Sequence, residues 1–192
     1  MNQEKPSSEE YYIDLYGRYN TGKSMLISKI GGLDYGTDLF FECKSIINYQ
    51  GICITTNITV NFVDDFAPMR VPRPDAPRKG FIILYSMVER DSFEYVNECY
   101  QDITRCYRNP LVYLCASKCD LVEERVVSQE EGEELAKQIG AFYMEISAKN
   151  NINVHELFYG LVEKIYQRNH PTVNQTPPKE QKSTKKEVCT VF

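Results

Sequence analysis

Short apolar segments alternate with amphipathic segments along most of the chain, which is the pattern of a parallel sheet covered by helices on both faces. Strands buried on both faces appear as continuous apolar runs, so these runs locate the strands. The expected strands are 11–16, a segment within 44–54, 58–63, 80–87, 111–116 and 141–146. The expected helices are 23–30, 92–107, 128–139 and a closing helix from about 153. The predicted fold class is therefore α/β, with three layers and a six-stranded, mostly parallel sheet.

Two of the expected helices carry capping signals. Ser128 and Glu131 form a capping box that opens one helix, and Gly140 ends it. Asn153 and Glu156 are expected to cap the closing helix. The apolar residues of this helix recur with a helical period and must face the sheet; they are Val154, Leu157, Phe158, Leu161, Val162 and Ile165.

The region between the first helix and the fourth strand is less regular. The second and third strands should form a hairpin, and its turn lies either at 49–51 or at 55–57, because both segments contain turn-forming residues. Segment 64–79 is predicted to be a stiff irregular loop, since prolines remove backbone donors and restrict the residues before them. Its prolines are Pro68, Pro72, Pro74 and Pro77.

The segment between the first strand and the first helix, 17–24, fits the pattern G-x-x-x-x-G-K-[ST]. Gly17 and Gly22 allow backbone N–H groups to curl around phosphate oxygens, Lys23 supplies a point charge, and Ser24 offers a hydroxyl to Mg²⁺. The pattern predicts a phosphate-binding loop. The alternative is a glycine-containing turn that holds nothing, because the middle of this loop carries an unusual Tyr19.

Polar segments also follow the fifth and sixth strands, at the sheet edge where ligands of open α/β sheets bind. The first, 117–120, ends in Asp120, whose carboxylate can accept hydrogen bonds from N1–H and the exocyclic amine of guanine. Adenine presents a different pattern to the same group. The second, 147–149, can offer a backbone N–H to the guanine carbonyl oxygen. Each segment alone also fits an ordinary polar loop, but together with the phosphate loop they indicate a guanine nucleotide.

Composition sets the outer bounds. A length of 192 residues, 42% of them hydrophobic, suits one domain and a tail. A net charge of −5 without a basic face argues against nucleic acid as a partner. The seven cysteines are unclustered, which favours reduced cytosolic thiols over disulfides or a zinc site. Residues 1–10 form a polar, disordered extension without signal-peptide character, Asn2 excludes N-myristoylation, and no apolar stretch is long enough to span a bilayer.

A series of short motifs, most of them in the second half of the chain, is similar to the motifs of one protein family. They lie at 80–85, 91–94, 110–112, 118–121, 127–128, 147–149, 152–154 and 156–159. In these residues the chain resembles the Ras-like small GTPases, and within them the Ras and Rap branch, over about 11–168. The resemblance implies a P-loop GTPase fold and a monomeric, signal-transducing molecular switch. It further implies GDP or GTP and Mg²⁺ as ligands, and exchange factors, activating proteins and effectors as partners.

The resemblance also implies roles for individual residues. Lys23 would contact the terminal phosphates, Ser24 and Asp64 would hold Mg²⁺, and Tyr35 would lean on the guanine edge. The complete set of implied nucleotide contacts is Gly17, Tyr19, Asn20, Thr21, Gly22, Lys23, Ser24, Met25, Tyr35, Ser117, Lys118, Asp120, Leu121, Ser147, Ala148 and Lys149.

Several positions depart from the family pattern. Ser117 replaces the asparagine of the base-reading box, and its shorter side chain is expected to lose one buried hydrogen bond, a cost of about 1–2 kcal/mol. Glu42 stands where the family keeps a threonine that senses the γ-phosphate. Ala67 replaces a glycine, and Pro68 replaces the glutamine that orients the attacking water. Tyr19 would crowd an incoming arginine finger.

These departures predict a weakened reaction. Phosphoryl transfer depends on positioning and charge stabilisation, so hydrolysis should be slow or absent, and no residue is assigned a catalytic role. The switch loops should also respond weakly to the γ-phosphate. The alternative is a pseudo-GTPase, an interaction module that neither switches nor hydrolyses. An ATP-using P-loop enzyme is disfavoured by Asp120.

The final residues, Cys189-Thr190-Val191-Phe192, fit the C-a-a-X prenylation pattern, and the terminal Phe favours geranylgeranylation of Cys189. The preceding segment, from 169, is predicted to be a flexible tail with a small surplus of lysines. It contains no second cysteine for palmitate. One prenyl chain with modest electrostatic help predicts reversible attachment to the cytoplasmic face of the plasma membrane or an endomembrane, with a cytosolic pool.

Overall fold

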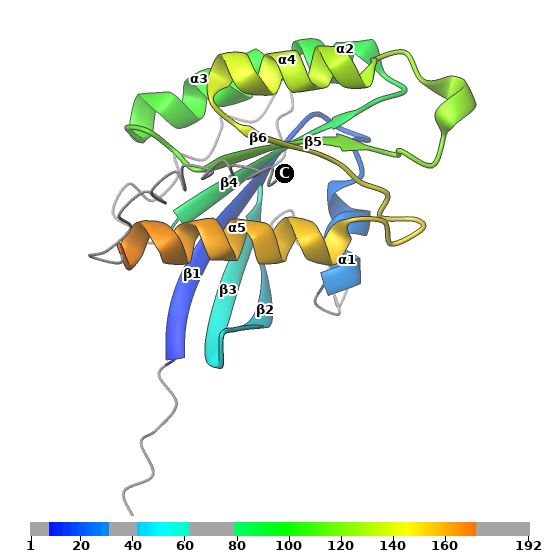
Figure 1. Cartoon of the computed structure of the whole chain (residues 1–192). Coiled ribbons are helices and arrows are strands. Elements are labelled where there is room, and N and C mark those ends of the chain that lie inside the picture. The colour runs from blue at the N-terminus through cyan, green and yellow to red at the C-terminus, as the bar shows by residue number, and fades with distance from the viewer. Residues whose placement is uncertain (1–7, 31–41, 62–78, 172–192) are drawn as a thin grey trace, which may run out of the picture.

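A computed structural model describes residues 8–30, 42–61 and 79–171 and confirms a six-stranded, mostly parallel sheet covered by helices (Figure 1). The strand order is β2-β3-β1-β4-β5-β6, and β2–β3 is the antiparallel pair among these strands. The strands are β1 (Ser8–Tyr16), β2 (Glu42–Tyr49), β3 (Ile52–Val60), β4 (Lys79–Ser86), β5 (Val112–Ser117) and β6 (Phe142–Glu145). The helices are α1 (Lys23–Ile30), α2 (Arg90–Glu94), α3 (Val96–Cys106), α4 (Gln129–Ile139) and α5 (Val154–Asn169), with a short 3₁₀ turn η1 (Val122–Glu124).

The helices form two layers. Helices α1 and α5 cover one face of the sheet, and α2, α3 and α4 cover the other (Figure 1). Strands buried on both faces present apolar side chains to both sides, so each helix layer encloses a hydrophobic cluster. The first cluster lies between the sheet and α1 and α5, and the second lies between the sheet and α2, α3 and α4. The six apolar residues of α5 that were predicted to face the sheet are all buried in the first cluster. Strands β1, β4, β5 and β6 are parallel, so the loops that follow them gather at one edge of the sheet.

The hairpin turn is at Gln50 and Gly51, which decides between the two predicted positions. Both residues have positive φ, 51° and 81°, as a tight two-residue hairpin turn requires. The third strand therefore starts at Ile52, so the predicted start at 58 was wrong; the strand ends at Val60, and the last two predicted residues, 62 and 63, lie outside the described residues. The segment 55–57 belongs to the strand because Thr56 is fully buried and donates its hydroxyl hydrogen bond to the Ser45 carbonyl at 3.0 Å.

The helix predicted at 92–107 is two helices. Helix α2 begins earlier, at Arg90, and Tyr95 separates it from α3. Ser92 lies inside α2, where its buried hydroxyl donates to the Glu89 carbonyl at 2.7 Å and accepts the Ser86 N–H at 2.9 Å. At Tyr95 the φ of −72° is helical, but the ψ of −13° departs from the helical value. The apolar periodicity continues across this residue, so the sequence pattern gave no sign of the interruption.

One of the two predicted helix caps is confirmed. Ser128 and Glu131 form the reciprocal capping box of α4, and Gly140 ends the helix at a φ of 68°. The cap predicted for α5 was wrong in mechanism. Asn153 adopts a left-handed conformation with a φ of 55° and makes no side-chain cap bond; its amide instead donates to the Glu145 carbonyl at 2.8 Å.

The first strand begins before its predicted start. Residues 8–10, which the sequence assigned to the N-terminal extension, pair with Cys53, Ile54 and Thr55 of β3. Pairing uses backbone groups, so polar side chains do not prevent it. The rest of that extension, segments 31–41 and 62–78, and the tail from 172 lie outside the described residues. No helix among the described residues is long and apolar enough to span a bilayer.

A buried ion pair joins β1 to β4 beside the cluster on the side of α2, α3 and α4. The Lys79 Nζ lies 2.6 Å from an Asp14 carboxylate oxygen, and both side chains are less than a tenth exposed. The ammonium also lies over the rings of Phe81 and Tyr107, at 5.7 and 5.5 Å from their centroids. Burial raises the pKa of Asp14, although Lys79 acts in the opposite direction. Lys79 therefore stabilises the ionised Asp14 carboxylate at a buried site, where an unpaired carboxylate would destabilise the fold.

Candidate functional site

The loop from Gly17 to Ser24 joins β1 to α1, as predicted. Gly17 has a φ of 145°, and a Cβ at this position would lie 2.2 Å from the Leu84 carbonyl oxygen of β4. No side chain fits there without moving the backbone. Gly22 also has a positive φ, 93°. The glycines therefore set the path of the loop close to the end of β4.

Lys23 lies within this loop and is buried. Its Nζ donates hydrogen bonds to the carbonyls of Gly17 at 2.5 Å and Arg18 at 2.6 Å. The Thr21 hydroxyl donates to the same Arg18 carbonyl at 2.8 Å. Burial lowers the pKa of Lys23 to about 8. The loop thus wraps around Lys23, the first residue of α1, and Ser24 follows it in the helix and is half-buried.

Ser117, at the end of β5, connects this loop to the base-reading segment. Its buried hydroxyl donates to the Thr21 carbonyl at 2.7 Å. The short side chain therefore makes one buried hydrogen bond to the loop; the expected loss of a further bond relative to asparagine stays a prediction. The next residue, Lys118, has a φ of 62°, which turns the chain sharply as it leaves the strand.

Asp120 is held by the segment that follows β6. The Ser147 hydroxyl donates to Asp120 Oδ1 at 2.6 Å and accepts the Asn150 N–H at 3.0 Å. The two segments are also joined through the backbone, where the Cys119 N–H donates to the Ile146 carbonyl at 3.1 Å. The predicted base-reading segments, far apart in sequence, are therefore one hydrogen-bonded unit.

A cavity of about 200 Å³ lies between these segments and the first turn of α1. Most of the predicted contacts line it: Asn20, Gly22, Met25, Ser117, Lys118, Asp120, Leu121, Ala148 and Lys149. Its remaining walls are Leu26, Leu84 and Ile146, which were not predicted as contacts because their apolar character indicates only a place in the core. The adjoining loop contains Gly17, Thr21, Lys23 and Ser24. Ser147 contacts the cavity indirectly, through its hydrogen bond to Asp120. Tyr35, Asp64, Pro68 and Cys189 lie outside the described residues.

The outer side of the phosphate loop is polar and exposed. Tyr19 is 83% exposed, so its ring stands free of the core. The Arg18 guanidinium lies 3.8 Å from Asp91 and 5.8 Å from the ring centroid of Tyr95. These weak contacts direct Arg18 toward the layer of α2 and α3.

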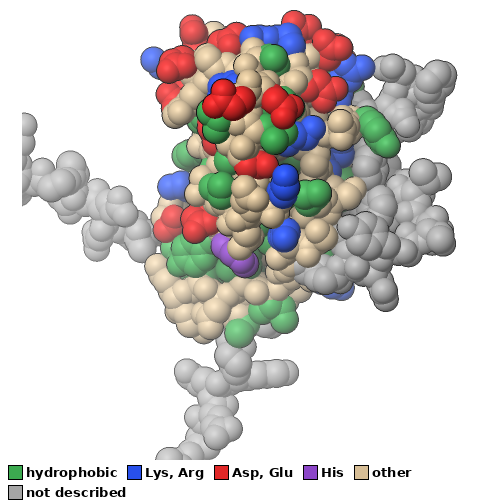
Figure 2. All heavy atoms as spheres, turned by 90° about the vertical axis from the view of Figure 1, so that its right-hand side faces the viewer, with side chains coloured by type: hydrophobic (Ala, Val, Ile, Leu, Met, Phe, Trp, Pro, Cys, Tyr) green, Lys and Arg blue, Asp and Glu red, His purple; other side chains and the backbone are tan. Residues whose placement is uncertain are grey.

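Charge is unevenly distributed over the face that contains the strand ends. Figure 2 shows most of the acidic side chains of this face over the layer of α2, α3 and α4, while Lys and Arg side chains lie both among them and nearer the middle. Glu130, Glu133 and Glu134 on α4 are among the exposed acids. Within the part of the chain that the structure describes, no three His, Cys, Asp or Glu side chains are close enough together to hold a metal ion.

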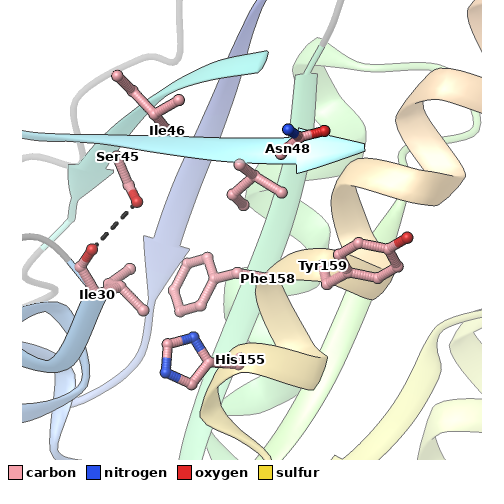
Figure 3. A pocket seen from close by; sticks show the side chains of 8 residues that line it. Ile30, Ser45, Ile46, Asn48, His155, Phe158 and Tyr159 are labelled. Carbon is pink, nitrogen blue, oxygen red and sulfur yellow. Dashed lines mark hydrogen bonds between the residues drawn. The ribbon is translucent and has the colours of Figure 1, made fainter. Parts of the chain in front are cut away.

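A second hollow, of about 320 Å³, lies between α1, β2 and α5 (Figure 3). Ile30, His155 and Phe158 point toward one another there, and the Ser45 hydroxyl donates to the Ile30 carbonyl at 3.1 Å. Among the residues that the structure describes, none of the predicted nucleotide contacts lines this hollow. It is separate from the cavity beside Asp120.

Comparison with known proteins places these features in a family. A profile of the Ras family matches residues 71–167. A Ras-like protein from Laccaria bicolor is 42% identical over 98 residues, which is 50% of this chain and 47% of that protein. The Ras-related protein Rab-3 from Caenorhabditis elegans is 39% identical over 109 residues, 56% of this chain and 50% of that protein. The chain thus spans about half the length of these relatives in its matches. The matched profile covers the base-reading segments and half of the sequence, and the chain belongs to the Ras family.

Proposed function

We propose that the chain binds GDP and GTP and acts as a membrane-anchored molecular switch of the Ras type. The observation that carries this proposal is the cavity in which Asp120 and Lys118 adjoin the phosphate loop. The hydrogen bond from Ser117 to Thr21 ties the two parts of the cavity together. Asp120 would bind the base of a guanosine polyphosphate, and the adjoining loop that contains Lys23 would bind its phosphates.

Guanine selection would reside in Asp120. Its carboxylate can accept two hydrogen bonds from the Watson–Crick edge of guanine, and Ser147 fixes one of its oxygens at 2.6 Å. The apolar walls of the cavity suit a purine ring, because base-binding sites are mostly apolar with a few placed polar groups. Adenine offers no matching pair of donors to this carboxylate.

The phosphates would bind at the loop, with Lys23 as the charged contact. Lys23 is buried within the loop and bonded to its carbonyls, so it is placed where an anion would replace neutral partners. Ser24 would supply a hydroxyl to Mg²⁺, with Asp64 as the second protein ligand. A magnesium ion that shares the substrate phosphates needs only one or two protein ligands. Bound there, the ion would neutralise phosphate charge.

Purified protein provides the direct test of nucleotide binding. Mass spectrometry of the nucleotide released on denaturation should find GDP or GTP, and purification in EDTA should reduce its amount. A stable fold that carries no nucleotide and takes up neither fluorescent GDP nor GTP would instead support the interaction module.

Hydrolysis is expected to be slow. Pro68 has no side-chain donor or acceptor to orient water, and the exposed side chain of Tyr19 would crowd an activating arginine. We expect the double variant Tyr19→Gly with Pro68→Gln to hydrolyse bound GTP faster by about tenfold or more, within the range of a positioned catalytic group. Single-turnover assays would measure this. Unchanged rates in a variant that still binds GTP would contradict it.

Membrane attachment is expected to depend on Cys189. Replacing Cys189 by serine removes the only thiol to which the C-a-a-X pattern could add a prenyl chain, so the membrane-bound fraction in eukaryotic cells should fall to background. The matched control is Cys106→Ser, which removes an exposed thiol on α3. Fractionation that finds Cys189→Ser still at the membrane would reject prenyl anchoring.

A further inference from the structure

An ion pair also joins the two predicted base-reading segments, in addition to the hydrogen bonds described above. Arg125 follows η1 in the segment that begins with Lys118 and Asp120, and Glu145 ends β6 just before Ile146 and Ser147. Their side chains meet in a two-pronged pair, with Nη1 to Oε1 at 2.8 Å and Nη2 to Oε2 at 2.8 Å. The pair spans the same two segments that the Ser147–Asp120 hydrogen bond joins.

The pair is shielded and rigidly held. Only 25% of the Arg125 side chain and 20% of the Glu145 side chain are exposed. The Tyr143 hydroxyl donates to Glu145 Oε1 at 3.0 Å, and the hydroxyl of Tyr85 on β4 lies 3.4 Å from that of Tyr143. Arg125 Nη1 also donates to the Val127 carbonyl at 3.3 Å. Hydrogen bonding to Arg125 is the main cause that lowers the pKa of Glu145, so the carboxylate is charged at neutral pH.

The pair constrains the separation of the two segments together with the Ser147–Asp120 and Cys119–Ile146 hydrogen bonds. Both segments leave the sheet as loops, and Asp120 lies on one while Ser147 and Lys149 lie on the other. The planar guanidinium fork fixes orientation as well as separation, unlike a single hydrogen bond. A shift of one segment would move Asp120 relative to the cavity wall formed by Ala148 and Lys149.

We propose that Arg125 and Glu145 are positioning residues for guanine recognition, which hold the segment of Asp120 against the segment of Ser147. This inference rests on the proposed nucleotide binding. Loss of the pair should weaken the contacts of Asp120 with both the N1–H and the exocyclic amine of guanine. Hypoxanthine lacks that amine, so an inosine nucleotide has only one of these contacts to lose. Selectivity for GDP over IDP should therefore fall, in addition to affinity.

The test compares full-length Arg125→Gln, Glu145→Gln and Arg125→Lys with the wild-type protein, using fluorescent GDP and IDP. Release of GDP should be about tenfold faster in the two Gln variants, which corresponds to about 1.4 kcal/mol. The ratio of the GDP and IDP affinities should fall in both. Arg125→Lys keeps the charge without the fork, so it should recover only part of the loss. Arg105→Gln breaks the exposed pair with Asp102 on α3 and should change neither quantity.

The outcomes separate this proposal from nucleotide binding itself. Wild-type protein that is folded but takes up no GDP would overturn both. Wild-type protein that selects GDP, with folded variants that keep its release rate and selectivity within twofold, would overturn the positioning role alone. Variants that lose GDP and IDP affinity in equal proportion would show a general structural effect and also reject it. Thermal unfolding of each variant shows which of them fold. If the two glutamine variants do not fold, Arg125→Lys still tests the positioning role.

Discussion

Replacing Lys79 by methionine should lower the free energy of unfolding by about 3–5 kcal/mol, because the substitution leaves the Asp14 carboxylate buried without its partner. Methionine keeps a long side chain against Phe81 and Tyr107, so packing loss contributes little. The double variant Asp14→Leu with Lys79→Met removes both charges and should be close to the wild type in stability, or more stable. Urea unfolding of the wild type and these variants gives the comparison.

The pH dependence provides an internal check on this result. Without Lys79, the pKa of Asp14 in the folded protein should rise further above its value in the unfolded chain. The folded state then binds more protons, so the stability of Lys79→Met should fall as pH rises between those two pKa values. The stability difference between Lys79→Met and the wild type should therefore be smaller at pH 5 than at pH 8. Arg105→Ala, which breaks an exposed pair, should cost no more than about 1 kcal/mol. If Lys79→Met and Arg105→Ala lowered the free energy of unfolding equally, burial of the Asp14–Lys79 pair would have no effect on stability.

Asp120→Asn should weaken GDP binding by roughly a hundredfold, because two hydrogen bonds to a carboxylate contribute about 3 kcal/mol or more. The same change should create affinity for xanthosine diphosphate. Xanthine carries a carbonyl where guanine carries the exocyclic amine, and the asparagine amide can donate to that oxygen while its own oxygen accepts N1–H. Competition with fluorescent GDP would measure both effects.

The matched control for this variant is Asp102→Asn on α3, which changes an acid with no place in the cavity. It should leave both affinities unchanged. Gain of xanthosine diphosphate binding is informative because misfolding cannot produce it. If Asp120→Asn lost GDP and gained nothing, the carboxylate would have a structural role rather than a base-reading one.

Features encoded by local sequence were predicted well. Helix α1, the α4 capping box and the buried face of α5 follow from short-range spacing and side-chain chemistry, and the structure confirms them. The phosphate loop and the segments of Asp120 and Ser147 were predicted to approach one another because parallel strands end at the same edge. The cavity they share agrees with that prediction.

Features that depend on tertiary partners were not predicted. The pairing of Asp14 with Lys79 and of Arg125 with Glu145 has no signal in sequence spacing, since each charge could equally face solvent. Asn153 is a common cap residue, but the nearby Glu145 carbonyl takes its amide instead. The hairpin turn was ambiguous because Thr56 looks like a turn residue, and only its burial against β2 shows it to be part of a strand.

The tight turn at Gln50 and Gly51 has a consequence for the order of folding. It brings β2 and β3 together through contacts between residues close in sequence, whereas β1 pairs with β3 and β4 across long stretches of chain. Local pairing loses little loop entropy and a hairpin can form within about 1–10 μs. We expect this hairpin to form early and to serve as the surface on which β1 docks, so the edge of the finished sheet would be among its first parts to assemble.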